Sequence, residues 1–535
     1  MNLWLKKFVC RVVKFQTKIA APKDASAIIL LNSEADKVLW AQRNPSLKFL
    51  GGYHAFPGGK LEPSDENVRV ENCQDAHLAK FIACAARETF EEIGVLLVRH
   101  GEKMTIGQRA SLHDDLISGR MTFAEILELW GLWIDAADFF YTGFWTTPEF
   151  SPVRFKTRFF LAVCPPKQKP FAAISELENI EFIKPTDALN VWKNSQVLIA
   201  PPVLLSLQTL AERFSPQRRK DTEISKKKPH RFSFENLSSS ASLRLCGENL
   251  LKQAEKFDGN INYIELNSRL ICFPLKTDTL PPATHTNCFI VGRERFAVID
   301  AASKDTAEQQ KLVELIDSFA ERGFVCNAII VSHLHPDHFG GETALQSHLR
   351  EKFGWQIPLS AHKSTAESLR GKVKIERFIT DNEIFELTDE NGKSFELAAL
   401  HTPGHARGHL CFYDEECGFL LSSDNVVGTG SVLIAPPEGN MLDYLNSLER
   451  MKNLPNLRFL CGSHGAAVFG AKAKIESYIA HRLERERKIL DAMADGAKTL
   501  REIVEKVYAD VSPELWKLAE KSVEAHLEKI ESEKD

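Results

Sequence analysis

The sequence predicts a multidomain chain that combines α/β and α+β folds. At 535 residues the chain is too long for one ordinary hydrophobic core, so two or three domains are expected. Short apolar runs alternate with helical patterns in both halves, which indicates sheets covered by outer helices. From Ala471 onward the sequence is helical and charged, which predicts a separate C-terminal segment.

Changes in composition divide the chain into five parts. We predict a basic N-terminal segment (1–23), a first domain (24–214), a polar basic linker (215–260), a second domain (261–470) and a C-terminal helical segment (471–535). In the first domain we expect strands at 25–31, 37–41, 95–98 and 158–163 and a helix at 76–93 that Gly94 ends. In the second domain we expect strands at 270–273, 288–291, 296–299, 328–331, 409–413 and 418–421, with helices at 306–320 and 342–352.

Composition excludes several classes of protein. The net charge is −5, so the whole molecule has no broad basic surface for nucleic acid. No apolar run has the length of a membrane span, and we expect no membrane partner. The 11 scattered cysteines indicate a reducing compartment. The first twenty residues are basic and contain no acid, which is typical of a short capping helix or of a transit peptide, so we expect a cytoplasmic protein or else a mitochondrial one.

The segment Ser332 to His338, SHLHPDH, carries the strongest chemical signal. His333 and His335 are two apart after an apolar run that reads as a strand, so both are expected to point to one side. Asp337 and His338 follow and can turn toward a second point. Imidazole and carboxylate without thiolate favour a hydrolytic zinc-type site, and two groups of ligands suggest two metal ions.

Three more candidate ligands follow predicted strands or tight turns. His405 ends the turn His401-Thr-Pro-Gly-His405, Asp424 follows an apolar strand, and His464 stands in Gly462-Ser-His-Gly465. A rigid scaffold presents binding residues in such loops. The seven residues together predict a metal centre.

The order HxHxDH, TPGH, strand-terminal Asp and late His-Gly resembles the metallo-β-lactamase superfamily. The resemblance implies an αββα sandwich with two zinc ions and a bridging hydroxide. His333, His335 and His405 would hold one zinc, and Asp337, His338 and His464 the other. Asp424 would bridge them, and Asp337 would also be catalytic.

The tail Tyr478-Ile-Ala-His481-Arg482-x3-Glu486 resembles the β-lactamase-like protein 2 group. That resemblance implies a winged-helix-like C-terminal segment and, since the group includes a single-strand endoribonuclease, cleavage of single-stranded RNA as the favoured activity. A thioesterase of the glyoxalase II type, acting on acyl-CoA or acyl-glutathione, is the alternative, because the same ligands hydrolyse thioesters.

A carboxylate helix marks the first domain. In Arg87-Glu-Thr-Phe-Glu-Glu-Ile-Gly94 the residues Glu88, Glu91 and Glu92 share one helical face, so their charges repel unless a cation neutralises them. Hard oxygen ligands of this kind suit Mg²⁺ or Mn²⁺ bound to a diphosphate. The sequence therefore predicts a second metal site.

With Phe56-Pro-Gly-Gly-Lys-Leu-Glu62, this helix resembles the Nudix box, although Asp65 replaces the usual Glu and 21 residues separate it from Arg87 instead of seven. The resemblance is to the Nudix 19-like and coenzyme A diphosphatase-like branch. It implies an α/β/α sandwich, metal binding by Glu88, Glu91 and Glu92 with Glu91 and Glu92 catalytic, and a nucleotide or CoA derivative as substrate.

The combined prediction is a bifunctional metal-dependent hydrolase, with a Nudix domain followed by a metallo-β-lactamase domain. Because the box is altered, a second alternative is that the Nudix domain is a nucleotide sensor without turnover.

Overall fold

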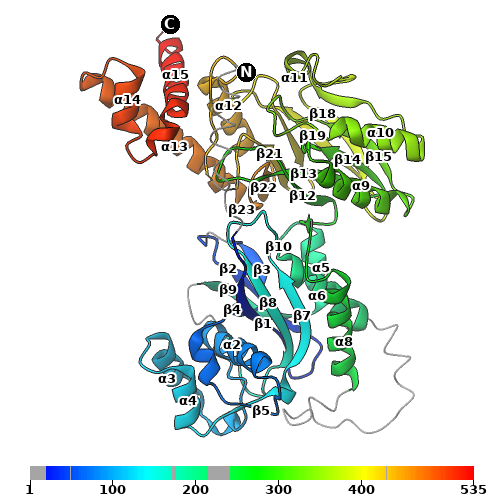
Figure 1. Cartoon of the computed structure of the whole chain (residues 1–535), viewed down its shortest axis with the longest axis vertical. Helices are drawn as coiled ribbons and strands as arrows, with labels where there is room; N and C mark the ends of the chain where they lie inside the picture. The colour runs from blue at the N-terminus through cyan, green and yellow to red at the C-terminus, as the bar shows by residue number, and fades with distance from the viewer. Residues whose placement is uncertain (1–19, 48–49, 172–175, 215–240, 429, 535) are drawn as a thin grey trace. The chain divides into compact units, whose positions relative to one another are not determined.

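The computed structural model describes residues 20–47, 50–171, 176–214, 241–428 and 430–534 (Figure 1). The chain divides into two compact units, the first ending at Asn262 and the second beginning at Tyr263. Most of the predicted basic N-terminal segment and of the predicted linker lies outside the described residues.

The first unit is built on one mixed sheet. The strands run in the order β10-β3-β2-β1-β8-β7, with β4 on β1 and β9 on β2. The central pair β1 and β8 is parallel over its whole length, from Lys23–Phe155 to Leu31–Val163. The strands are β1 (Lys23–Leu31), β2 (Val38–Arg43), β3 (Tyr53–Ala55), β4 (Gly58–Lys60), β7 (Phe140–Thr146), β8 (Phe155–Val163), β9 (Leu177–Ile183) and β10 (Leu198–Ile199), and the short β5 (Val70–Glu71) and β6 (Ile134–Asp135) pair separately.

Helices cover both faces of this sheet. Alternation along β1 sends Ile28 and Leu30 to one face and Ile29 and Leu31 to the other, and all four are buried. The first face packs against α2 (Ala76–Ile93), α3 (Ile106–Ile117) and α4 (Phe123–Leu129), and the second against α5 (Pro185–Lys193), α6 (Pro201–Phe214) and α8 (Ala241–Lys256). The unit is an α/β/α sandwich, as predicted.

The long helix of the first unit has the predicted bounds. Asp75 caps its N-terminus by accepting the His77 N–H, and Gly94 ends it in the left-handed region at φ 65°. The residues inserted ahead of Arg87 form a 3-10 turn η1 (Pro63–Asn67), β5 and the first turns of α2. The insertion therefore lengthens the helix and leaves its carboxylate end regular.

The predicted strand at 95–98 is wrong. The segment is fully buried but pairs with no neighbouring strand. Instead the side-chain amide of Gln168 accepts the Leu96 N–H at 2.8 Å and donates to the Leu96 carbonyl at 3.0 Å. Two hydrogen bonds from one side chain satisfy the backbone where a ladder was expected.

The range predicted as a linker includes a packed helix. Leu243, Cys246, Leu250 and Ala254 of α8 are buried in the core of the first unit. Gly143 of β7 lies so close to α8 that a Cβ on this glycine would meet the Ala254 side chain at 2.5 Å. The sequence predicts a linker here because polar residues surround these four apolar positions.

The second unit contains a larger set of strands. Their order is β11-β12-β13-β14-β18-β19-β20-β21-β22-β23, and a parallel branch β15-β16-β17 starts from β14. The strands are β11 (Ile264–Glu265), β12 (Leu270–Lys276), β13 (His285–Gly292), β14 (Arg295–Ile299), β15 (Val325–Ile330), β16 (Leu359–His362), β17 (Arg377–Ile379), β18 (Glu383–Thr388), β19 (Ser394–His401), β20 (Leu410–Asp414), β21 (Phe419–Ser423), β22 (Phe459–Gly462) and β23 (Val468–Phe469).

Both halves of this set are buried on both faces, as an αββα sandwich requires. One core joins β12–β15 to α9 (Thr306–Ala320) and α10 (Glu342–Phe353). A second core joins β19–β22 to α12 (Met441–Lys452) and α13 (Ala471–Ala494). Side chains of the opposite faces, such as Phe289 and Phe412, are also fully buried. The short α11 (Lys363–Ser368) follows β16.

The C-terminal part of the unit is helical, as predicted. Helix α14 (Leu500–Val507) has a capping box from Thr499 and Glu502, and it packs with α15 (Trp516–Ser532) and the end of α13 around a small apolar core. The described residues also contain the 3-10 turns η2 (Gly101–Lys103), η3 (Ala136–Asp138) and η5 (Pro513–Leu515). Among the described residues, no helix combines the length and the apolar character needed to cross a membrane.

One buried histidine makes the first unit sensitive to acid. The ring of His54 on β3 lies 4.2 Å from the Trp40 ring at an interplanar angle of 40°, and its Nδ1 has no hydrogen-bond partner in the described structure. Burial lowers the pKa of His54 from 6.5 to about 4. As pH falls below 6.5 the unfolded chain binds the proton first, so stability present above that pH is lost on the way to pH 4.

We predict that His54→Phe will flatten the pH dependence of stability. The wild type should lose up to about 3 kcal/mol between pH 6.5 and 4 through this residue, and the variant should not. Thermal unfolding followed by circular dichroism at several pH values measures the difference, with exposed His77→Phe as the control. Equal slopes for the wild type and His54→Phe would contradict the assignment.

Candidate metal centre

The loop after β15 carries four of the predicted ligands. The strand ends at Ile330, so His333 and His335 lie in the loop and not at the strand end as expected. They still converge, because His333 Nε2 lies 3.1 Å from His335 Nδ1. His333 is fully buried and His335 partly so, which gives one face of the site access to solvent.

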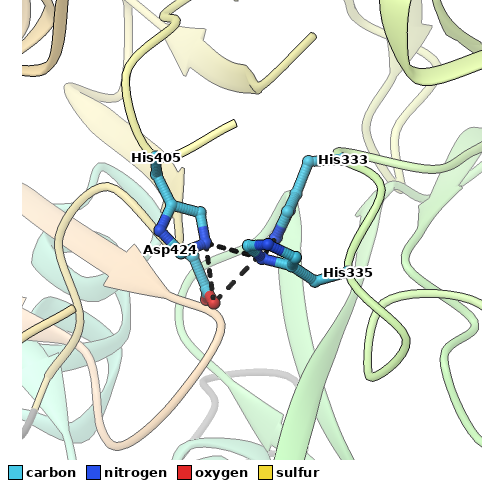
Figure 2. Close-up of side chains that lie close together, drawn as sticks. All are labelled: His333, His335, His405 and Asp424. Carbon is cyan, nitrogen blue, oxygen red and sulfur yellow. Dashed lines mark hydrogen bonds and ion pairs between the residues drawn. The ribbon is translucent and has the colours of Figure 1, made fainter. Parts of the chain in front are cut away.

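Four side chains form the first ligand group: His333, His335, His405 and Asp424. His405 Nε2 lies 2.8 Å from His335 Nδ1 and 3.6 Å from Asp424 Oδ2 (Figure 2). Their ligand atoms all lie within 4.8 Å of one another. The group combines residues from three loops that are far apart in the sequence.

Asp337, His338 and His464 form the second group. His464 Nε2 is 3.6 Å from Asp337 Oδ2 and 3.5 Å from Asp424 Oδ1. His338 Nε2 is 3.4 Å from Asp424 Oδ2. Asp424 therefore faces both groups, and the structure brings together all seven residues that the sequence singled out.

Two atoms in this centre lack hydrogen-bond partners in the described structure although they are buried: His338 Nε2 and Asp424 Oδ1. Buried polar atoms are rarely left unpaired in native proteins. A set of imidazole and carboxylate donors turned toward two points fits divalent metal ions.

The outer nitrogens of the candidate ligands are held by hydrogen bonds. His338 Nδ1 lies 2.9 Å from Asp300 Oδ2, His405 Nδ1 donates to the Leu433 carbonyl at 2.9 Å, and His464 Nδ1 donates to the His285 carbonyl at 2.9 Å. Such contacts fix the ring orientation and the tautomer of a metal ligand. Asp300 also accepts the Ser332 N–H and hydroxyl at 2.7 Å, which ties the ligand loop to the end of β14.

His409 is a functional residue that the sequence prediction missed. It is fully buried, and its Nε2 accepts the Asp424 N–H at 3.2 Å. Because a backbone amide can only donate, the His409 proton must be on Nδ1, which lies 3.1 Å from Thr402 Oγ1. With both nitrogens engaged, His409 positions Asp424 and does not join the ligands. The spacing His405-x3-His409 was its only signal.

Burial and charge divide the histidines into two kinds. Burial lowers the pKa of His333 and His335 and lowers that of His405 to about 3, so these rings are neutral and can bind a cation. Burial also disfavours charge on His338 and His464, but nearby carboxylates together outweigh it and raise the pKa of both rings: Asp424 with Asp300 at His338, and Asp424 with Asp337 at His464. In turn these two rings hold the pKa of Asp424 well below its usual range in spite of burial.

The carboxylate helix of the first unit is organised around Arg87. Its guanidinium pairs with both oxygens of Asp65, Nε with Oδ1 at 2.7 Å and Nη2 with Oδ2 at 3.1 Å. Nη1 donates to Glu88 and to Glu91, each at 2.9 Å. Asp65 therefore orients Arg87 in spite of the intervening 21 residues, and Arg87 aligns two of the three predicted metal ligands.

Glu92 accepts the Gly58 N–H at 2.8 Å. A Cβ on Gly59 would meet the Glu88 carboxylate at 2.4 Å, so any other residue here would require the Glu88 side chain to shift. Burial raises the pKa of Glu88 to about 7 and also raises the pKa of Glu91 and Glu92. Unlike the histidine centre, these carboxylates do not form a compact ligand group in the described structure.

Comparisons with known families agree with these two sites. Residues 22–114 match the NUDIX domain, residues 258–464 the Metallo-beta-lactamase superfamily, and residues 499–534 the Beta-lactamase associated winged helix domain. The chain therefore joins an N-terminal Nudix domain to a metallo-β-lactamase superfamily domain and a winged helix domain. Both catalytic families are hydrolases that bind divalent metals, and the protein is a metal-dependent hydrolase.

Curated relatives match a little under half of the chain. A Caenorhabditis elegans Beta-lactamase-like protein 2 homolog is 28% identical over 236 residues, which cover 44% of this chain and 74% of the relative. An Aspergillus chevalieri protein named Atrochrysone carboxyl ACP thioesterase is 28% identical over 243 residues, 44% of this chain and 71% of the relative. A NUDIX hydrolase structure from Alicyclobacillus acidocaldarius is similar to 38% of this chain and covers 97% of its own, at 27% identity and a TM-score of 0.32.

We predict that Asp65→Asn will destabilise the first unit by about 3 kcal/mol, because it leaves the buried Arg87 guanidinium without its main partner. Chemical denaturation measures the loss. Glu66→Gln is the matched control: Glu66 lies beside Asp65, but its side chain is 63% exposed and it pairs with Lys80 at the surface, so about 0.5 kcal/mol or less is expected. Equal effects of the two changes would contradict the bracing role.

Proposed function

We propose that the second unit is a hydrolase with a dinuclear zinc centre. His333, His335 and His405 would hold one zinc and Asp337, His338 and His464 the other, with Asp424 between them. The observation that carries the proposal is the position of Asp424, whose two oxygens lie within 3.6 Å of imidazole nitrogens from both groups. A single carboxylate shared in this way suits two adjacent cations.

Bound zinc would supply an activated water at neutral pH and polarise the scissile bond. The protein side chains fix the positions of the metal ligands and their protonation states. Because His333, His335 and His405 are neutral, each ring has one unprotonated nitrogen that a cation can take up. Asp300, Leu433 and His285 orient the outer nitrogens of three ligands. Asp337 has 15% of its side chain exposed, and we assign it a second role as proton acceptor at the open side of the site.

For the substrate we propose a thioester of a phosphopantetheine thiol, such as an acyl-CoA. Support comes from the relatives named as ACP thioesterases, since an acyl carrier protein presents its acyl group on the same thiol arm as coenzyme A. The Nudix box, which resembles coenzyme A diphosphatases, adds a second reason. Both halves would then act on parts of one class of molecule.

For the first unit we propose cleavage of the diphosphate in coenzyme A or a related nucleotide. Glu88, Glu91 and Glu92 would bind Mg²⁺ or Mn²⁺ with the substrate diphosphate. Burial favours the protonated form of each carboxylate, so a divalent cation has to displace protons there. The ion pairs of Arg87 with Glu88 and Glu91 hold these two carboxylates in position.

Endonucleolytic cleavage of single-stranded RNA is the second candidate for the metallo-β-lactamase domain. The winged helix match at 499–534 and the β-lactamase-like protein 2 homologs favour it. The basic stretch of the predicted linker, Arg218 to Lys228, would also suit RNA and lies outside the described residues. We place thioester hydrolysis first because both the relatives named as ACP thioesterases and the coenzyme A-like Nudix box favour it.

We predict that the zinc-loaded protein releases free thiol from acyl-CoA, and faster than from S-lactoylglutathione, which lacks the phosphopantetheine arm. Asp337→Ala should lower kcat/KM by more than about 100-fold, since even outer partners of ligands contribute about 10- to 100-fold. A colorimetric thiol assay measures the rate. Exposed Asp443→Ala, in the same domain, should keep the wild-type rate. Cleavage of labelled single-stranded RNA without thiol release would move the assignment to the second candidate.

We predict that wild-type protein with Mg²⁺ converts coenzyme A to phosphopantetheine and adenosine bisphosphate, and that Glu91→Gln reduces turnover at least about 10-fold by removing a metal-binding carboxylate. Chromatography of the products gives the rate, with exposed Glu102→Gln as the control. Equal turnover in Glu91→Gln would remove Glu91 from its role. A rise in Tm with coenzyme A but no product in the wild type would favour the sensor alternative.

A further inference from the structure

One face of α13 is turned toward the metal centre. Lys474, Tyr478 and Arg482 follow one another at four-residue intervals, so they share a face of the helix. Tyr478 and Arg482 are buried, with 6% and 3% exposed. Tyr478 and Arg482 belong to the tail pattern that resembles the β-lactamase-like protein 2 group, and nothing in the hydrolytic chemistry above requires them.

All three side chains bind the backbone that follows Asp424. Lys474 Nζ donates to the Gly428 carbonyl at 3.3 Å. The Tyr478 hydroxyl accepts the Val427 N–H at 3.3 Å and donates to the Gly430 carbonyl at 2.8 Å. Arg482 Nη2 donates to the Val432 carbonyl. We call residues 425–428 and 430–433 the clamped segment.

The clamped segment contacts candidate ligands of both groups. It begins directly after Asp424. The Gly428 N–H donates to the His464 carbonyl at 2.9 Å, and the Leu433 carbonyl accepts the His405 Nδ1 proton at 2.9 Å. A shift of this segment would move Asp424, His405 and His464 together, because each is bonded to it.

The clamped segment is closely packed by its neighbours. The Tyr444 hydroxyl donates to the Asn425 carbonyl at 2.6 Å, and Arg482 lies over the Tyr444 ring at 5.5 Å. A Cβ on Gly428 would meet the Ala466 carbonyl oxygen at 2.4 Å. Gly430 is exposed, but Val427 and Val432 are buried, so loss of the Tyr478 hydroxyl or of Arg482 removes a partner from the Val427 N–H or from the Val432 carbonyl. Such buried backbone groups are costly to leave unpaired.

We propose that Tyr478 and Arg482 are positioning residues of the metal centre: through the clamped segment they set the spacing of Asp424, His405 and His464. Helix α13 is then part of the site and not only a connection to the winged helix domain. The inference rests on the metal centre of the proposed function and is independent of which bond is hydrolysed.

The test compares Tyr478→Phe and Arg482→Met with Arg485→Met in the full-length protein. Phenylalanine removes one oxygen and keeps the ring in its core, and methionine keeps most of the Arg482 stem. Arg485 is the matched control, because it lies on the same helix and binds the Val507 carbonyl and Asp510 but not the clamped segment. Zinc affinity is measured by competition with a chromophoric chelator, and ligand geometry by the visible absorption of the Co²⁺-substituted protein.

We expect Tyr478→Phe and Arg482→Met to bind zinc about 10- to 100-fold more weakly and to change the Co²⁺ spectrum, as loss of outer contacts does at other metal sites. Arg485→Met should keep wild-type affinity and spectrum. Wild-type affinity and spectrum in Tyr478→Phe would overturn the inference even if Arg482→Met fails to fold. A wild-type protein that binds no zinc would overturn the proposed metal centre and this inference together.

Discussion

The second unit depends on one buried carboxylate placed among imidazoles. Asp424 lies within 3.6 Å of His338, His405 and His464, and these rings and burial together decide the charge of the centre. A carboxylate buried in this way is stable only with positive charge beside it. Without a cation, protons on His338 and His464 meet that need, which their raised pKa values reflect. Divalent metal ions would supply more positive charge beside Asp424 than these protons do. The stability of the fold and the hydrolytic chemistry therefore both require positive charge at this carboxylate.

The rest of the unit positions that carboxylate. The Asp424 backbone is held by His409, and the residues after it are held by α13. In the half of the sandwich opposite Asp424, Asp300 at the end of β14 binds the side chains of Ser332 and His338, which follow the neighbouring β15. The ligands of the two halves meet at Asp424, and hydrogen bonds hold them in place. The first unit uses the same principle at smaller scale, where Asp65 orients Arg87 and Arg87 aligns Glu88 and Glu91.

Much of this could be predicted because the signals are local. Helix 76–93 has both its N-cap and its Gly94 stop in adjacent residues, and the second-domain strands are short apolar runs. The seven candidate ligands stood out by residue type and by their place after predicted strands. The strand predicted at 95–98 was wrong because an apolar run predicts burial but not which group pairs with its backbone. That group is the side chain of Gln168, which lies far along the chain. Helix α8 was not predicted because the polar residues around it indicated a solvated linker, although its apolar residues pack into the core.

The sequence by itself determined the two families, the order of the domains and the residue types at both sites, because each is written in short motifs whose chemistry does not depend on distant contacts. Only the tertiary structure decided that Asp424 faces both ligand groups, that His409 positions it without joining the ligands, and that Tyr478 and Arg482 reach the segment beside it. These depend on distances between residues far apart in the chain. Packing sets such distances, and no local pattern encodes them.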